Sequence, residues 1–227
     1  MSEWRNFSST DELDRELAQH IAGQLSAAID AHGQASLAVS GGGTPTKMFQ
    51  QLSRHQLEWS RVWITLVDER WVATDSQESN EHLVRHNLLQ NCAAAAHFVG
   101  LKSAHPDARD AVPEVGRRLD QIARPFTVVV LGMGGDGHTA SWFPQATNLR
   151  ALLDGDSAQV VAATQPVTAP HQRMTLTLCA ALNTRSLIVN ITGAAKKAVL
   201  ENAREKRYPI AAILEQNTTA ATIWWAP

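Results

Sequence analysis

The segment A-S-L-A-V-S-G-G-G-T-P, residues 35–45, decides the fold. Ala35–Val39 is an apolar run with the length of a buried strand. Ser40–Thr44 places three glycines in a turn, and Pro45 is suited to the first position of a helix. A buried strand that turns tightly into a helix is typical of an α/β fold with a parallel sheet.

The alternation of strands and helices continues on both sides of this segment. Residues 10–33 predict an amphipathic helix, because leucine or isoleucine recurs every four residues from Leu13 to Ile29 and Gly33 is a stop signal. Further strands are predicted at residues 62–67, 126–131, 186–191 and 222–225, and further helices at residues 79–89 and 194–203. We therefore expect a single domain over residues 1–227, with a doubly wound, mostly parallel sheet flanked by helices.

The composition excludes several classes of partner. The net charge is −2 over 227 residues, and the densest basic stretch, residues 196–207, is interrupted by acids, so no nucleic-acid groove is predicted. No apolar run is long enough to span a membrane, and the first residues lack the features of a signal peptide. Two cysteines, Cys92 and Cys179, are too few for a disulfide framework, which favours a cytoplasmic protein.

Three of the predicted strands end in unusual loops: Ser40–Thr44, Asp68–Arg70 and Gly132–His138. In open parallel sheets, ligands bind outside the carboxyl ends of the strands. We therefore expect these three loops to converge on one site.

The first of these loops, Ser40–Thr44, has the composition of a phosphate cradle. Glycines let backbone N–H groups approach an anion closely, and the following helix adds favourable partial charge at its N-terminus. It is not a Walker loop, because Thr46 stands where the glycine before Lys47 would have to be. The alternative is a tight turn that binds no ligand.

The loop after residues 126–131 matches G-x-G-x-x-G, the pattern of dinucleotide-binding folds, from Gly132 to Gly137. Pro144 follows too soon for the long helix of a Rossmann unit, and the acids Asp154 and Asp156 precede the next apolar run rather than follow it. We therefore expect a modified Rossmann-like fold without dinucleotide binding, and no cofactor.

The same loop carries His138 two residues after Asp136, and a histidine in this setting can act as a general base. Asp136 can orient its ring or bind substrate. In the second loop, Arg70 can bind phosphate, polarise a carbonyl or simply pair with Asp68. Lys196, one turn into a predicted helix, and Arg173 offer positive charge to a phosphate or to solvent.

Motifs for metal-dependent and covalent hydrolysis are missing from the sequence. His82 and His86 have the spacing of a zinc-binding pair, but Leu83 stands where the glutamate of H-E-x-x-H would be, so we expect no metal site. There is also no G-x-S-x-G nucleophile elbow.

Taken together, the loops resemble the 6-phosphogluconolactonase family, within a larger group that includes glucosamine-6-phosphate deaminase. The resemblance rests on segments in a specific order: Val39–Pro45, Val67–Val72, Ser79-Asn80, Leu131–Ser141, Arg173–Thr177 and Gly193–Lys196. It implies hydrolysis of 6-phosphoglucono-lactone in the oxidative pentose phosphate pathway, with no cofactor. One departure is Trp142, where lactonases commonly have an aliphatic residue.

Two alternatives remain at this point. The first alternative is the deaminase branch, which carries a glutamate five residues after the histidine, where this chain has Phe143. Deaminases also usually have a tyrosine at the position of Arg70. The second alternative is a phosphosugar-binding protein without catalysis, against which the presence of both Asp136 and His138 argues.

The lactonase reading assigns hypothetical roles to the predicted residues. His138 activates water, and Asp136 orients His138 or binds a sugar hydroxyl. Arg70 or nearby backbone N–H groups stabilise the oxyanion. The predicted substrate- and phosphate-binding residues are Ser40, Gly41, Gly42, Gly43, Thr44, Asp68, Arg173 and Lys196. The expected partner is a small phosphosugar lactone, and the expected assembly is a monomer or a small homo-oligomer.

Overall fold

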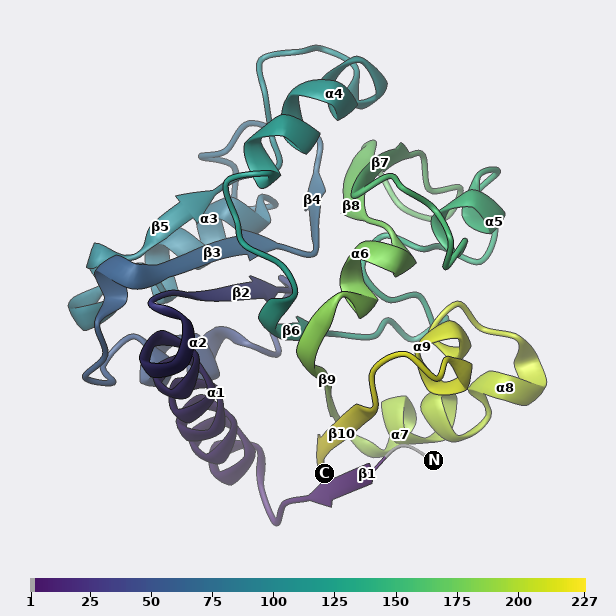
Figure 1. The fold of residues 1–227 in the computed structure, drawn as a ribbon. Helices are drawn as coiled ribbons and strands as arrows, with labels where there is room; N and C mark the ends of the chain where they lie inside the picture. Colours follow the sequence, from purple (N-terminus) through teal and green to yellow (C-terminus); the bar gives the residue numbers. More distant parts are fainter. Residues whose placement is uncertain (1–2) are drawn as a thin grey trace.

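The computed structural model describes residues 3–227 and has a large, entirely parallel sheet at its centre (Figure 1). Seven strands follow one another in the order β1-β10-β9-β6-β2-β3-β5. Their bounds are Glu3–Asn6 (β1), Ala221–Ala226 (β10), Thr184–Thr192 (β9), Phe126–Leu131 (β6), Ala35–Val39 (β2), Val62–Leu66 (β3) and His97–Val99 (β5). The mostly parallel α/β sheet predicted from the sequence is confirmed.

The middle of this sheet is buried on both faces. Every residue of β2 and of β6 is buried, which explains why both strands are continuous apolar runs rather than alternating ones. Ser36 and Thr127 are the two polar residues of these strands, and the Thr127 hydroxyl oxygen accepts a hydrogen bond from the Ser36 N–H at 3.0 Å. This hydrogen bond helps to fix the register between the central strands β2 and β6.

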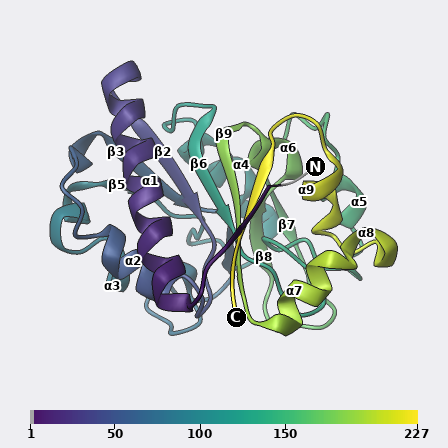
Figure 2. The same ribbon diagram turned by 90° about the horizontal axis from the view of Figure 1, so that it is seen from below.

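Helices cover the sheet from both sides. Helix α1 (Thr10–His32) begins at Ser9, whose side chain accepts from the Glu12 N–H, and ends at Gly33 in the left-handed conformation. In Figure 2, α1 and α2 lie to one side of β9 and β10, and α7, α8 and α9 lie to the other. The remaining bounds are Thr46–Leu52 (α2), Asn80–Asn87 (α3), Ala108–Leu119 (α4), Leu149–Leu152 (α5), Leu178–Leu182 (α6), Ala194–Glu201 (α7), Ala203–Lys206 (α8) and Ala211–Glu215 (α9). None of the helices within residues 3–227 is long and apolar enough to cross a membrane.

A second, antiparallel sheet of three strands was not predicted. It consists of β4 (Asp68–Arg70), β8 (Arg173–Leu176) and β7 (Val161–Thr164), and it lies between α4 and α5 in Figure 1. The expectation that residues 68–70 form a loop is therefore wrong. They pair with a strand more than 100 residues later, and such pairing leaves no trace in a local pattern.

Several element boundaries also differ from the expectation. Pro45 caps α2 instead of opening it, so the helix begins at Thr46. The helix predicted over residues 194–203 is broken at Asn202, which separates α7 from α8. The edge strands β1 and β5 were missed because they are only four and three residues long.

The chain order of the strands defines where the sheet opens. From β2 the chain proceeds outward through β3 to β5, and from β6 it proceeds in the opposite direction through β9 to β10. The loops after β2 and β6 therefore diverge at a topological switch point, the position where open α/β sheets bind ligands.

Candidate active site

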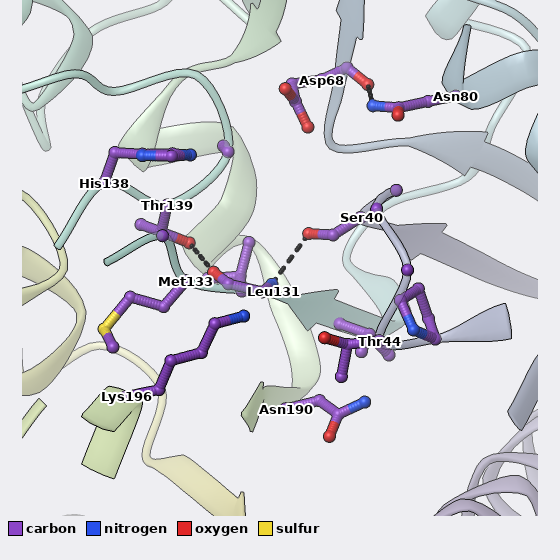
Figure 3. Close-up of a pocket in the computed structure, with 18 of the residues that line it drawn as sticks. Ser40, Thr44, Asp68, Asn80, Leu131, Met133, His138, Thr139, Asn190 and Lys196 are labelled. Carbon is purple, nitrogen blue, oxygen red and sulfur yellow. Dashed lines mark hydrogen bonds between the residues drawn. The ribbon is translucent and has the colours of Figure 1, made fainter. Parts of the chain in front are cut away.

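A cavity of about 180 Å³ opens at this switch point (Figure 3). All three loops that the sequence singled out contribute to its lining, so their predicted convergence is found in the structure. The predicted residues among those lining the cavity are Ser40, Gly41, Gly42, Gly43, Thr44, Asp68, Arg70, His138 and Lys196. Asp136 and Arg173 are not in the lining.

A hydrogen bond joins the first loop to the third, and a second one closes the third loop on itself. The Ser40 hydroxyl oxygen accepts from the Gly132 N–H at 2.9 Å, and the Thr139 hydroxyl donates to the Gly132 carbonyl at 2.7 Å (Figure 3). The Ser40 N–H also donates to the Val130 carbonyl at 3.0 Å. The two bonds of Ser40 hold the glycine-rich loop beside the end of β6 and the start of the histidine loop.

Position 41 requires a glycine because the side chain of Asn80, at the start of α3, packs against it. Asn80 donates from Nδ2 to the Asp68 carbonyl at 2.8 Å, and its Oδ1 lies so close to Gly41 that a Cβ atom there would collide with it. The glycine at position 41 thus lets the glycine-rich loop pack against Asn80, which in turn fixes the strand carrying Asp68.

Glu69 is a fully buried carboxylate whose role is to hold β4 against α3. It accepts hydrogen bonds from the backbone N–H groups of Arg70, Asn80 and Glu81 and from the Ser79 hydroxyl, at distances between 2.7 and 3.0 Å. Burial raises the pKa of Glu69, and these hydrogen bonds oppose that rise. Glu69 therefore positions β4 and does not line the cavity.

Asp68 and Arg70 have separate partners. Asp68 Oδ2 accepts from the Ser141 hydroxyl at 2.6 Å, and the Arg70 guanidinium donates to the Glu78 carbonyl at 2.6 Å. No ion pair joins Asp68 to Arg70 within residues 3–227. The interpretation in which Asp68 simply pairs with Arg70 does not describe this structure, and both side chains face the cavity.

His138 is held on three sides. Its Nδ1 lies 2.5 Å from Oδ1 of Asp136, its ring stacks on Phe143 with centroids 4.3 Å apart, and Gly134 lies against the ring. Because Nδ1–H donates to the carboxylate, Nε2 is left as an acceptor. Figure 3 shows the ring reaching into the cavity. This geometry suits a base that removes a proton from a water molecule.

Lys196 extends from the first turn of α7 into the cavity (Figure 3). It is half-buried and forms no ion pair with any carboxylate among the described residues. Burial lowers the pKa of the Lys196 ammonium, because its charge has lost part of its hydration. An anionic ligand group in the cavity would restore a favourable environment for this charge.

Arg173 lies outside the cavity lining. Its Nη1 donates to the carbonyls of Pro170 and His171, and its guanidinium stacks 5.8 Å from the ring centroid of Phe143. It is directly opposite Arg70 in the antiparallel sheet, and burial lowers its pKa. Arg173 therefore contacts the aromatic ring that supports His138 and contributes positive charge from behind it.

Comparison with known proteins identifies the family of this chain. A model of the family described as glucosamine-6-phosphate isomerases/6-phosphogluconolactonase matches residues 8–224. The chain belongs to this family. It is 42% identical over 225 residues to a 6-phosphogluconolactonase from Rhizobium meliloti, with 97% of each chain covered. A crystal structure of a 6-phosphogluconolactonase from Shewanella baltica superposes with a TM-score of 0.97 at 44% identity, covering 100% of this chain and 98% of the other.

The same fold also occurs in the deaminase branch of the family. A monomeric glucosamine-6-phosphate deaminase superposes with a TM-score of 0.78 at 18% identity, covering 99% of this chain and 97% of the other, which shows a shared fold alone. The difference lies in the site. The position at which the resemblance to deaminases calls for a glutamate is Phe143, which is 5% exposed and stacked on His138. A hydrocarbon ring there cannot exchange a proton.

Several residues that line the cavity were not predicted as site residues from the sequence. Asn80, Met133, Thr139 and Asn190 all line the cavity. Asn80 and Thr139 lie within segments that carry the family resemblance, so the sequence could have identified both as candidate site residues. Asn190 was overlooked because it interrupts an apolar run that was interpreted only as a strand.

Proposed function

We propose that this chain hydrolyses 6-phosphoglucono-1,5-lactone to 6-phosphogluconate, with His138 as the general base. Membership of the family, and the high identity over nearly the full length to proteins named 6-phosphogluconolactonase, support this substrate. The observation that carries the mechanism is the short contact between His138 Nδ1 and Asp136, which leaves Nε2 free at the cavity.

The phosphate of the substrate binds between the Ser40–Thr44 loop and Lys196. Backbone N–H groups of a glycine-rich loop are suited to an anion, and the half-buried ammonium of Lys196 gains a counter-ion when phosphate binds. Arg173 lies behind Phe143 and outside the lining, so we assign it no contact with the phosphate. Anchoring one end of the flexible sugar acid brings the lactone carbonyl toward His138.

At the other end of the cavity, His138 removes a proton from water as the oxygen attacks C1 of the lactone. Such a step contributes about 10²- to 10⁴-fold to the rate. Asp136 keeps the imidazole in the tautomer that accepts at Nε2 and stabilises the imidazolium that forms. When the tetrahedral intermediate collapses, His138 returns the proton to the ring oxygen and the ester bond opens.

Negative charge develops on the carbonyl oxygen during the attack. Arg70 lines the cavity and keeps guanidinium N–H groups beyond the one that Glu78 accepts, so it can stabilise the oxyanion. Asp68 uses one carboxylate oxygen for Ser141, and its other oxygen can accept from a sugar hydroxyl. These assignments divide the cavity into a cationic end for phosphate and a polar end for the lactone ring.

We further infer a cytoplasmic protein that acts as a monomer or small homo-oligomer. Cys92 and Cys179 are both free thiols, which is the state favoured by a reducing compartment. The partner is a small phosphosugar lactone rather than a macromolecule.

The proposed function is tested by giving the wild-type protein both family substrates. Freshly generated 6-phosphoglucono-lactone should disappear much faster than in a protein-free blank, and glucosamine 6-phosphate should release no ammonia. A lactone rate equal to the blank would contradict the proposal, and ammonia release would favour the deaminase alternative. Saturable lactone binding without turnover would favour a non-catalytic phosphosugar-binding protein.

A further inference from the structure

The turn between α8 and α9 packs against the loop that carries His138. The Ile210 N–H donates a hydrogen bond to the Gly137 carbonyl at 3.0 Å. Tyr208 lies against the same glycine, because a Cβ atom on Gly137 would come within 2.4 Å of both Cβ and Cγ of Tyr208. Gly137, which joins Asp136 to His138, is therefore held by a hydrogen bond and by an aromatic side chain from a distant part of the sequence.

The turn is itself fixed by its own hydrogen bonds and by burial. Arg207 ends α8 in the left-handed conformation, and the Tyr208 N–H donates to the Ala203 carbonyl at 3.0 Å. The Tyr208 carbonyl accepts from the Ala211 N–H at 2.8 Å. Ile210 is fully buried, and Tyr208 is half-buried against the hydrophobic core. The backbone of Tyr208 is thus held at both its N–H and its carbonyl, so its side chain is a defined support for Gly137.

The contact between Asp136 and His138 depends on the backbone of Gly137. These two side chains can meet because the chain turns at Gly137, whose φ is 76°. The turn is closed by the Gly137 N–H, which donates to the Gly134 carbonyl at 3.1 Å. A shift of Gly137 would move both partners of the 2.5 Å contact between His138 Nδ1 and Asp136 Oδ1.

The segment that contains Tyr208 also supplies the cation of the cavity. Lys196 is in α7, which leads directly through α8 to the turn at Tyr208. In Figure 3, His138 and Lys196 lie on one side of the cavity, and Ser40 and Thr44 lie on the other. Residues 194–210 therefore contribute Lys196 directly and support the loop of His138 from outside the cavity.

We propose that Tyr208 is a positioning residue for the general base. The inference rests on the proposed function, in which His138 activates water. Tyr208 is not in the lining of the cavity, so it acts through Gly137 and keeps Asp136 and His138 in contact. Such support matters because a displacement of about 1 Å in a reacting group can lower the rate about a hundredfold.

The test compares Tyr208→Ala and Tyr208→Phe with wild type in the steady-state hydrolysis of fresh 6-phosphoglucono-lactone. Alanine removes the ring from Gly137 and should lower kcat about tenfold with little change in KM. Phenylalanine keeps the Cβ, Cγ and Cδ2 atoms that lie against Gly137, so kcat should stay within about twofold of wild type. The matched control is Leu214→Ala, which removes another half-buried side chain, on α9, and should leave kcat unchanged.

A double-mutant cycle with Asp136→Asn tests whether Tyr208 acts through the Asp136–His138 contact. In the Asp136→Asn protein that contact is already altered, so adding Tyr208→Ala should change kcat by less than about twofold. A loss as large as in the wild-type background would overturn the inference. So would a phenylalanine variant as slow as the alanine variant, or a rise in KM at unchanged kcat.

Failure of this inference is distinguishable from failure of the proposed function. Wild type no faster than a protein-free blank would overturn both, whereas an active wild type whose kcat is unchanged by Tyr208→Ala would overturn this inference alone. Urea unfolding checks that the variants fold. If Tyr208→Ala does not fold, Gly137→Ala, whose added methyl group collides with Tyr208, must lower kcat with the same dependence on Asp136. An unchanged kcat in that variant would overturn the inference.

Discussion

Gly134 lies directly against the imidazole ring of His138, and a Cβ atom at position 134 would collide with both Cε1 and Nδ1 of that ring. The glycine therefore leaves the space in which the ring contacts Asp136 and reaches the cavity. The next residue differs sharply in this respect, because a Cβ atom on Gly135 would meet no heavy atom within 4 Å.

Replacing Gly134 with alanine should impair catalysis by displacing His138. We expect kcat to fall by about tenfold to a hundredfold, since the base contributes at least that much to the rate. Gly135→Ala is the matched control and should keep kcat within about twofold of wild type. Steady-state lactone hydrolysis by both variants checks this, and equal activities would show that the ring tolerates the added methyl group.

Asp136→Asn should separate orientation of the base from binding of the substrate. An asparagine can present an N–H to the ring and favour the tautomer in which Nε2 carries the proton. We expect kcat to fall about tenfold to a hundredfold with little change in KM. A rise in KM at unchanged kcat would instead mean that Asp136 binds a sugar hydroxyl, the role that the sequence also allowed.

The lowered pKa of Lys196 predicts a pH dependence of phosphate binding. Only the ammonium form binds phosphate, so affinity for the product 6-phosphogluconate should be full at neutral pH and fall as the pH rises through a value below the ordinary 10.5. The product is used because it is not itself hydrolysed.

Isothermal titration calorimetry from pH 7 to pH 10 measures this dependence. Lys196→Met should bind weakly at every pH. The control is Lys197→Met, because Lys197 stacks on Trp225 at 4.2 Å and does not line the cavity. Equal losses in the two variants would show that general positive charge, and not the Lys196 ammonium in the cavity, binds the phosphate.

Asp14 should make the protein less stable at high pH. It is 4% exposed in α1, and burial raises its pKa to about 6. Between about pH 4 and pH 6 the folded state therefore binds more protons than the unfolded state, so the free energy of unfolding falls as the pH rises. Asp14→Asn should be more stable than wild type by about 2 to 3 kcal/mol at pH 8, and the difference should shrink toward pH 4. Urea unfolding at the two pH values measures this, and a pH-independent difference would contradict the raised pKa.

The elements that could be predicted are those formed by residues close together in the sequence. The apolar run Ala35–Val39 and the glycines after it indicate a strand and its turn, and all three chemistry-bearing loops lie where parallel strands must end. The partners of Asp68 and Arg70 could not be predicted in the same way, because they come from Ser141 and Glu78 and from a pairing between β4 and β8 that is distant in sequence.

The roles of individual polar residues show a similar division. Asp136 and His138 are two residues apart, and their contact follows from that spacing. Arg173 was expected to contribute charge at the phosphate, yet its guanidinium is held by two carbonyls behind Phe143. Asn190 could have been noticed as a single polar residue within an apolar strand, but only the three-dimensional structure shows that this residue lines the cavity.

The central claim is that His138 is the base in lactone hydrolysis. The most direct measurement follows the disappearance of fresh 6-phosphoglucono-lactone with wild type, with His138→Ala and with no protein. We predict that wild type is much faster than the blank and that His138→Ala loses at least about a hundredfold in kcat, with KM little changed. A His138→Ala protein that keeps near-normal kcat while KM rises would contradict the claim and make His138 a binding residue.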